Sequence, residues 1–524
     1  MARELPSRKT IFTPAGRIRN AREFVEASTR SRSYIYAFIG KMSPWETRAP
    51  VNGISQSNPA VVTSYSHPFT EDQAVIISDV MGMSQINGYG GVPIRIQNVT
   101  KDTFELVGVD STTFGTYSGG GWITSIEDAD WPAPSNAAFE AAEAFRRSFY
   151  MKRIPAADMC FVVPKYVWTP GTNYAQTDYT DPQIFDKKFY VVNSVGRVYK
   201  CLSNNANTAS TVEPTSTSLA RFTTSDGYVW KYLYQLSTAD RQRFETDDWL
   251  PVRIKEYDDG SDQWDIQQAA RPGTLDAVVV IDGGQNFTSA GATFTIVGDG
   301  TGARVSIPAA GVDSSGRIIR VQVDDPGENY TWAEILISHP NGYGARFRAV
   351  ISPMKGHGWN AVEELGGRRV FIDSAFDGDA GELAMTGSDF RQMGIVASPL
   401  SLTTGQPVIG QEYDLRETFE LTNVNVKNPS DNEPFIVGQK ITGITSGATA
   451  YVAGVGAGFI RVCEITGSFQ TSETIDSATG TATLGTVTRP PVDKLSGSVI
   501  YLENRGPTYR TPTQTEKLRT VIEF

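Results

Sequence analysis

The stretch DGYVWKYLYQL, residues 226–236, decides the fold class of this 524-residue chain. Because side chains alternate between the two faces of a β-strand, a strand here would place every second residue on the same face. Four large rings would then lie together: Tyr228, Trp230, Tyr232 and Tyr234. Such rings need a covering layer, and the run FYVVNSVGRVYKCL at 189–202 supplies one as a hairpin that turns at 193–196. The two stretches predict a packed sheet with an aromatic core.

Composition extends this expectation to the rest of the chain. The sequence holds 49 Gly and 28 Pro together with abundant Thr, Ser, Val and Asn, which favours turns and short strands over long helices. The length corresponds to about three or four compact units. We therefore expect a mainly β protein with a few helices, of the α+β class.

Charge restricts the kinds of partner. The formal net charge is −11, so phosphate would repel the chain and no nucleic-acid binding is expected. Residues 1–41 differ, with nine Lys or Arg against three Glu, and we interpret them as a basic arm or as a docking arm for an acidic neighbouring subunit. The alternating stretch YIYAFIG at 34–40 argues against a targeting peptide. No apolar run reaches the roughly 18 residues of a membrane span.

Residues that could carry chemistry are sparse. Three separated cysteines suit a reducing compartment and buried apolar roles better than disulfides: Cys160, Cys201 and Cys463. Three histidines each lie beside Pro or Gly, which favours structural or exposed roles: His67, His339 and His357. No HExxH, CxxC, GxSxG or GK[ST] signature occurs. We therefore assign no metal-binding, cofactor-binding or nucleophilic residue, and expect no cofactor.

Pairs of carboxylates are the remaining candidates for catalysis, because glycosidases need only two acids at a fixed separation. Neighbouring acids in the sequence include Asp181 with Asp186, Asp247 with Asp248, and Glu363 with Glu364. Most surface carboxylates serve solvation, so we assign no catalytic residue and expect a protein that is not an enzyme. The aromatic row at 228–234 could be a sugar-stacking platform or an interface, but a buried sheet face is the favoured interpretation.

Two helices and a terminal strand are predicted around this sheet. Residues 17–29 form an amphipathic helix whose inner stripe is Ala21, Phe24, Val25 and Ser28. Residues 135–153 form the best helix, with an inner stripe of Phe139, Ala142, Phe145 and Phe149. The last residues, LRTVIEF at 518–524, stay apolar to the end, which predicts a strand held in a sheet or against a partner.

Gly-rich β segments interrupt this pattern. The segment 54–122 resembles the small β-barrel-like module of ubiquitin-activating enzymes that recurs in phage tail proteins, and it contains no cysteine for ubiquitin chemistry. VVVIDGGQNFT repeats as RVQVDDPGENYT with a period of about 42 residues, which aligns Gly284 with Gly327, Phe287 with Tyr330 and Gly302 with Gly344. A second repeat aligns Phe435 with Phe469. Each repeat predicts two copies of a small β unit that stack on each other.

The alternation predicts one discontinuous core with three inserted β modules. The core segments are 1–50, 126–268, 353–430 and 490–524, and the inserts are 51–125, 269–352 and 431–489. Insertions of this kind are tolerated at surface turns, because a longer loop adds little closure entropy.

Ordered pieces of the core segments carry a specific resemblance. They are MKRI from Met151, VVPKYVWTPGTNYAQTDYTD from Val162, FYVVNSVGRVYKCLSNN from Phe189, STVEPT from Ser210, TSDGYVWKYLYQLS from Thr224, WLPV from Trp249, GHGWNAVEELGG from Gly356, DFRQMGIVASP from Asp389 and VIYLENRGPTYRTPTQTEKLRTVIEF from Val499. In this order they resemble the baseplate wedge subunit of T-even-like contractile-tailed phages, over roughly half of the chain.

The resemblance implies a structural virion protein of the tail baseplate, assembled in the host cytoplasm. It implies a homodimer that joins other baseplate wedge proteins, as a bracket in a contractile tail. The inserted modules would project outward and add neighbour contacts or weak contact with host-surface glycans. Two alternatives stay open: a tail adhesin that binds glycans through its β modules, and a polysaccharide hydrolase.

Overall fold

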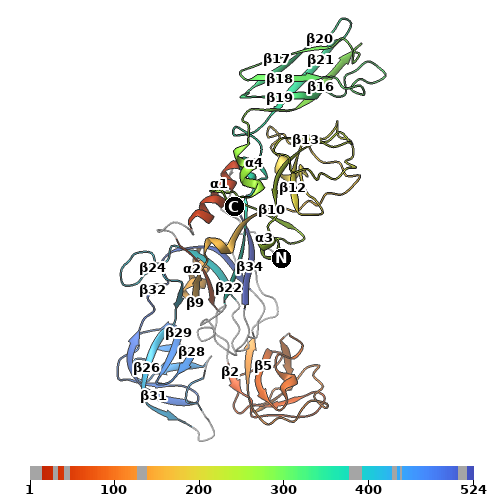
Figure 1. Ribbon diagram of the computed structural model, residues 1–524. Coiled ribbons are helices and arrows are strands. Elements are labelled where there is room, and N and C mark those ends of the chain that lie inside the picture. The colour runs from red at the N-terminus through yellow and green to blue at the C-terminus, as the bar shows by residue number, and fades with distance from the viewer. Residues whose placement is uncertain are drawn as a thin grey trace.

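The computed structural model describes residues 14–27, 34–40, 48–91, 93–126, 138–376, 392–427, 433–436, 439–504 and 516–524. Short strands dominate these ranges, which confirms the predicted mainly β class with a few helices. The helices are α1 (Pro14–Ala27), α2 (Ala138–Arg146), α3 (Thr238–Phe244), α4 (Asp262–Gln268) and α5 (Ala361–Glu364). Figure 1 shows an elongated molecule, with one inserted module at one end of a central core and two at the other.

Two sheets of the core draw their strands from distant parts of the chain. The first has the order β25 (Glu412–Asp414), β9 (Ser148–Arg153), β1 (Ile35–Gly40), β23 (Gln392–Ala397) and β33 (Ser498–Asn504). The second has the order β15 (Trp249–Val252), β10 (Met159–Pro164), β22 (Arg369–Phe376) and β34 (Glu516–Glu523). Strands from all four expected core segments therefore meet in hydrogen-bonded ladders.

The central strand β1 is buried on both faces. Ile35, Ala37 and Ile39 pack in a cluster with side chains of the second sheet, such as Ile372. Tyr36 and Phe38 pack on the other side, where Phe38 lies 5.2 Å from Phe145 of α2 between ring centroids. Helix α1 covers the first cluster with Ala21 and Phe24, as its predicted inner stripe requires. Ser28 of that stripe lies outside the described residues.

The aromatic stretch forms a third sheet, with the order β11 (Tyr190–Val192), β12 (Arg197–Ser203), β14 (Val229–Gln235) and β13 (Phe222–Thr223). The predicted hairpin is confirmed, and all four rings of the row are buried. The prediction that they share one face is wrong for Tyr234, which packs in a different cluster from Tyr228, Trp230 and Tyr232. Tyr199 pairs with Tyr232 but Val198 pairs with Tyr234, so an extra residue forms a bulge that breaks the alternation.

Helix α2 is shorter than predicted, and its inner stripe differs. The helix ends at Arg146, and the chain continues as β9, where Ser148 pairs with Gly40 and Tyr150 with Ile39 of β1. Pairing with β1 satisfies the backbone of these residues in a strand, which overrides their helical periodicity. Phe139 is 76% exposed and Ala142 is exposed as well, whereas Phe145 is buried as predicted, together with Ala144. Phe149 is buried as a strand residue.

The first inserted module is a seven-stranded sheet around its own apolar cluster. Its strands follow the order β2 (Arg48–Pro50), β8 (Gly119–Ile126), β5 (Ala74–Met81), β6 (Ile94–Gln97), β7 (Thr103–Leu106), β4 (Val61–Thr63) and β3 (Gly53–Ile54). The short strands follow from the Gly-rich turns in the sequence.

The second inserted module interleaves its two repeats instead of stacking two separate units. Each strand of the first copy pairs with one of the second: β16 (Leu275–Gln285) with β21 (Tyr343–Ile351), β17 (Thr293–Gly298) with β20 (Ala333–Ser338), and β18 (Thr301–Ser306) with β19 (Gln322–Glu328). The aligned rings Phe287 and Tyr330 are both buried. A Cβ on Gly342 would lie 2.3 Å from the Phe287 ring and one on Gly300 2.4 Å from the Tyr330 ring, so matched glycines make room for matched rings.

The third inserted module is a closed barrel with the order β26 (Glu417–Val426), β29 (Phe459–Thr466), β28 (Thr449–Gly456), β27 (Lys440–Gly443), β30 (Thr474–Asp476) and β31 (Gly480–Thr488). The repeats form the hairpins β27–β28 and β30–β31, which meet through β27 and β30. The barrel begins at Glu417, before the predicted boundary at residue 431, because β26 closes it. A small pair, β24 (Leu400–Ser401) with β32 (Val492–Asp493), lies beside its base.

The terminal strand β34 pairs with β22 along its whole length, which confirms that the last residues are held in a sheet. Leu518 is fully buried, and the ring of Phe524 lies 5.0 Å from that of Phe24 in α1. Glu523 receives ion pairs from Arg17, Arg368 and Arg369. The end of the chain is therefore part of the central core.

Candidate functional site

A buried network of ionisable side chains lies where the second module joins the core. Asp276 comes from β16 of the module, His357 from the segment after β21, Glu364 from the end of α5, and Lys200 from β12. His357 Nε2 lies 2.5 Å from Asp276 Oδ2, and its Nδ1 lies 3.5 Å from Glu364 Oε2. Lys200 Nζ donates to Glu364 and also, at 3.2 Å, to the hydroxyl of Tyr179. We call Asp276, His357, Glu364 and Lys200 the second-module joint.

Electrostatics at the second-module joint favour a charged carboxylate. Burial by itself would raise the pKa of Glu364, but Lys200 and His357 outweigh it and lower that pKa to about 2. The amide of Gly358 also donates to Glu364 Oε1 at 2.7 Å. Burial lowers the pKa of the nearby Lys231 to about 8. A paired, hydrogen-bonded arrangement of this kind fixes geometry more than it adds stability.

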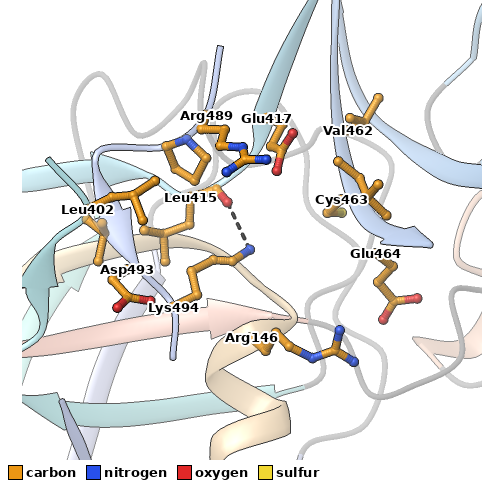
Figure 2. A pocket seen from close by; sticks show the side chains of 13 residues that line it. Arg146, Leu402, Leu415, Glu417, Val462, Cys463, Glu464, Arg489, Asp493 and Lys494 are labelled. Carbon is orange, nitrogen blue, oxygen red and sulfur yellow. Dashed lines mark hydrogen bonds between the residues drawn. The ribbon is translucent and has the colours of Figure 1, made fainter. Parts of the chain in front are cut away.

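A different arrangement holds the third module, around a cleft of about 260 Å³ (Figure 2). Lys494 Nζ donates to the carbonyl of Ser148 at 2.8 Å and to that of Leu415 at 2.9 Å, and Figure 2 shows the amine directed at Leu415. Burial lowers the pKa of Lys494 to about 8 and raises the pKa of Glu417. We call Lys494 and its two carbonyl partners the third-module joint.

A buried arginine strengthens the third-module joint. Arg416 donates through Nη1 to the carbonyl of Ala453 in the barrel at 2.7 Å and through Nε to Asp414 Oδ1 at 2.8 Å. Arg461 of β29 reaches the other oxygen of Asp414 at 3.0 Å. Asp414 in β25 therefore links the first core sheet to the barrel on two sides.

Neither joint has the arrangement of a catalytic site. An amine with a pKa near 8 can act as a nucleophile, but Lys494 is engaged by two backbone carbonyls that cross-link β9 to the start of the barrel. Glu364 is held by Lys200, His357 and Gly358, which leaves it as a fixed acceptor. What both arrangements can do is set the orientation of a module relative to the core.

The carboxylate pairs named from the sequence are not brought together as catalytic pairs. Asp181 contacts Lys187 at 2.5 Å, whereas Asp186 contacts Arg368 at 3.4 Å. Glu363 contacts Arg22 of α1 at 3.5 Å while its neighbour Glu364 is directed into the second-module joint. Asp247 and Asp248 are exposed.

The histidines and cysteines considered from the sequence pack against neighbouring side chains or bond to the backbone. His67 is half-buried in the first module, where it stacks on Phe69 at 5.4 Å between ring centroids. His339 Nδ1 accepts the amides of Asn341 and Gly342 in the second module. The three cysteines are buried and unpaired with one another, as expected of small apolar residues. In the described ranges no cluster of three or more His, Cys, Asp or Glu could hold a metal ion.

Sequence reasoning missed Lys200 and Asp276. Their partners lie 164 and 81 residues away in the chain, so local spacing could not join them. One signal was present: Lys200 and Lys231 each interrupt an otherwise apolar strand, and a buried lysine requires a partner.

Comparison with known proteins adds one local match. A family model described as "Ubiquitin-activating enzyme E1 FCCH domain" matches residues 57–127, which span most of the first inserted module from β4 to β8. This agrees with the resemblance expected for residues 54–122. No curated protein matches the chain. Among the helices of the described ranges, none combines the length and apolar character that crossing a membrane requires.

Proposed function

We propose that this chain is a non-enzymatic baseplate wedge protein of a contractile phage tail. In this proposal it is a virion component that forms a homodimer and links neighbouring wedge subunits as a bracket. The resemblance of the core segments supports it, together with an architecture suited to carrying several contacts at once.

One observation carries the proposal: three β modules are mounted on a single core built from four separate segments of the chain. In chain order each module lies between two core segments, and strands of these segments pair in two hydrogen-bonded sheets. The second-module joint holds the buried pair of Lys200 and Glu364, and the third-module joint holds the half-buried Lys494 on two backbone carbonyls, and these bonds restrict reorientation. A bracket requires this combination of spread contact surfaces and defined angles between them.

Solution mass and particle assembly test the proposal. Light scattering on the purified chain should give twice its mass of 57.1 kDa. Co-expression with the other wedge proteins of the same phage should yield a complex that contains this chain. Electron microscopy of the tail should then place it in the baseplate. A strictly monomeric protein that joins no particle would contradict the proposal.

A second candidate function is glycan binding by the second module. Trp332 and Tyr343 are 52% and 61% exposed there, and exposed aromatic rings stack on sugars. Screening the purified protein on host glycans separates the candidates. Saturable glycan binding that is lost in Trp332→Ala favours an adhesin, and release of oligosaccharides favours a hydrolase. If the protein neither binds nor cleaves the glycans, the bracket function is favoured.

A further inference from the structure

A long groove runs between the core and the second module. Its first part is a cleft of about 1030 Å³ bordered by α1, the segment 179–185, the segment 351–360 and α5. A second cleft of about 590 Å³ continues along the module to Trp332. Tyr179, Ile351, Ser352 and Met354 line both clefts, so the two form one elongated depression. We call it the joint groove.

The walls of the joint groove expose large apolar side chains. Met354 is 89% exposed, and Trp359 and Trp332 are 39% and 52% exposed. Ile184 and Phe185 form part of the apolar floor. Flexible methionines and tryptophans that stay exposed in a free protein are typical anchors of protein interfaces. The elongated shape suits an extended chain better than a compact small molecule.

The carboxylates that line the joint groove already have cationic partners within this chain. The pairs are Asp178 with Arg348 at 2.5 Å, Asp181 with Lys187 at 2.5 Å, Glu363 with Arg22 at 3.5 Å, and Glu364 with Lys200. Two cations of the rim are held more loosely. Lys355 Nζ lies over the Trp359 ring at 4.7 Å, and Arg19 reaches Glu23 only at 3.9 Å with both side chains well exposed. The charge remaining at the rim is therefore positive, in a chain whose net charge is −11.

We propose that the joint groove binds an extended acidic segment of a neighbouring protein, with apolar side chains on Met354 and Trp359 and carboxylates facing Lys355 and Arg19. Exposed apolar anchors would supply most of the binding energy, and the basic rim would select the sign of the partner's charge. This inference names the chemistry of one partner of the proposed bracket and rests on that proposal. The sequence separately suggested a basic arm at 1–41, to which Arg19 belongs.

Two short synthetic peptides test the charge and the apolar anchors, using the complete chain and fluorescence anisotropy at low salt. One peptide alternates Glu with Leu, and the other has Lys in place of each Glu. The acidic peptide should bind about tenfold more tightly than the basic one. The variants Met354→Ser, Trp359→Ala and Lys355→Glu should each weaken it by about tenfold. Matched controls at exposed sites outside the groove, Leu495→Ser and Lys101→Glu, should bind as the unaltered chain does.

Oxidation of Met354 locates the bound peptide independently of substitutions. Peroxide converts an exposed methionine to its sulfoxide, and mass spectrometry of peptides follows the rate at this residue. At about ten times its Kd the acidic peptide should slow oxidation of Met354 about tenfold, whereas the basic peptide at the same concentration should slow it only about twofold.

Three patterns of peptide binding would overturn the groove proposal. They are equal binding of the two peptides, binding that the groove variants do not alter, and binding that appears only after residues 1–13 are removed, since the chain's own start would then be the occupant. A groove variant that fails to bind peptide but also loses the solution dimer would identify a second copy as the occupant. If the peptide does not bind while the protein still enters particles, the groove proposal is wrong and the proposed bracket function stands. If the protein binds the peptide but stays monomeric and outside particles, the groove proposal stands and the bracket function is wrong.

Discussion

The second- and third-module joints each hold a module against the core, but they use different kinds of bonds. At the second, Lys200 and His357 contact two carboxylates in a buried network. At the third, Lys494 donates to two neutral backbone carbonyls. A network of opposite charges depends on every member being present, whereas a single cation on backbone dipoles loses only its own bonds when removed. Single substitutions and acid should therefore lower the stability of the protein more when they act on the second-module joint than when they act on the third.

Removing the lysine of the second-module joint should have the largest effect. Lys200→Met leaves the charge of Glu364 buried with weaker compensation, which should lower the free energy of unfolding by about 3–5 kcal/mol. Denaturant unfolding of the complete chain measures the loss, and proteolysis near the boundary of the second module shows whether it is local.

A double substitution is the control for this prediction. Lys200→Met combined with Glu364→Gln removes both charges and keeps an oxygen to accept the amide of Gly358. Most of the lost stability should return, because the cost arises from the unpaired charge. If the double variant is as unstable as the sum of the single variants, the network is not the source of the effect.

Acid should weaken the second-module joint through Glu364. Its pKa is about 2 in the folded chain against 4.5 as the ordinary value, so its contribution is complete above pH 4.5 and is lost as the pH falls toward 2. The shift corresponds to about 3 kcal/mol. Thermal unfolding midpoints of the unaltered chain and of Glu364→Gln should converge as the pH falls through this window. Curves that stay parallel would mean that Glu364 is not charged in the folded protein.

The third-module joint should respond less to substitution. Lys494→Met leaves the carbonyls of Ser148 and Leu415 without this donor, which should lower the free energy of unfolding by about 1–3 kcal/mol. Calorimetry of the complete chain would measure it. A loss larger than that of Lys200→Met would reverse the comparison between the joints.

Alkaline pH gives an independent readout of Lys494. Its pKa is about 8 in the folded chain against an ordinary 10.5, so the unfolded chain binds more protons between these values and stability rises with pH there. The unaltered chain should gain stability relative to Lys494→Met from pH 8 to 10.5. Lys231 shifts in the same direction but is present in both proteins, so the difference isolates Lys494.

Local sequence patterns predicted several individual strands, whereas long-range strand pairing decided where helix α2 ends and which way Tyr234 points. Alternation located β14 and the hairpin β11–β12, and the apolar end of the chain predicted β34. The prediction of a helix through residue 153 was wrong because residues 148–153 form backbone hydrogen bonds with β1. Helical periodicity in the sequence does not reveal this distant strand. The bulge that redirects Tyr234 likewise arises from pairing with β12.

The joints were the least predictable part. Glu364 and His357 were visible in the sequence as an acid and a histidine beside glycines, but nothing local indicated that they share a site with Asp276 and Lys200. The interleaved strand pairing of the second module could not be predicted because it too depends on contacts between distant residues. A repeat shows that two copies exist, whereas their mutual strand pairing depends on how the chain crosses between them.

An exposed ion pair outside both joints should show the smallest effect and so calibrates the comparison. Arg304 and Asp325 join β18 to β19 at 3.3 Å, with 77% and 43% of their side chains exposed. Water screens such a pair, so Arg304→Ala should leave the free energy of unfolding unchanged within the error of the same denaturant assay. A loss equal to that of Lys200→Met would show that pairing itself, and not burial of the charges, sets the sensitivity. The special fragility of the second-module joint would then have no physical basis.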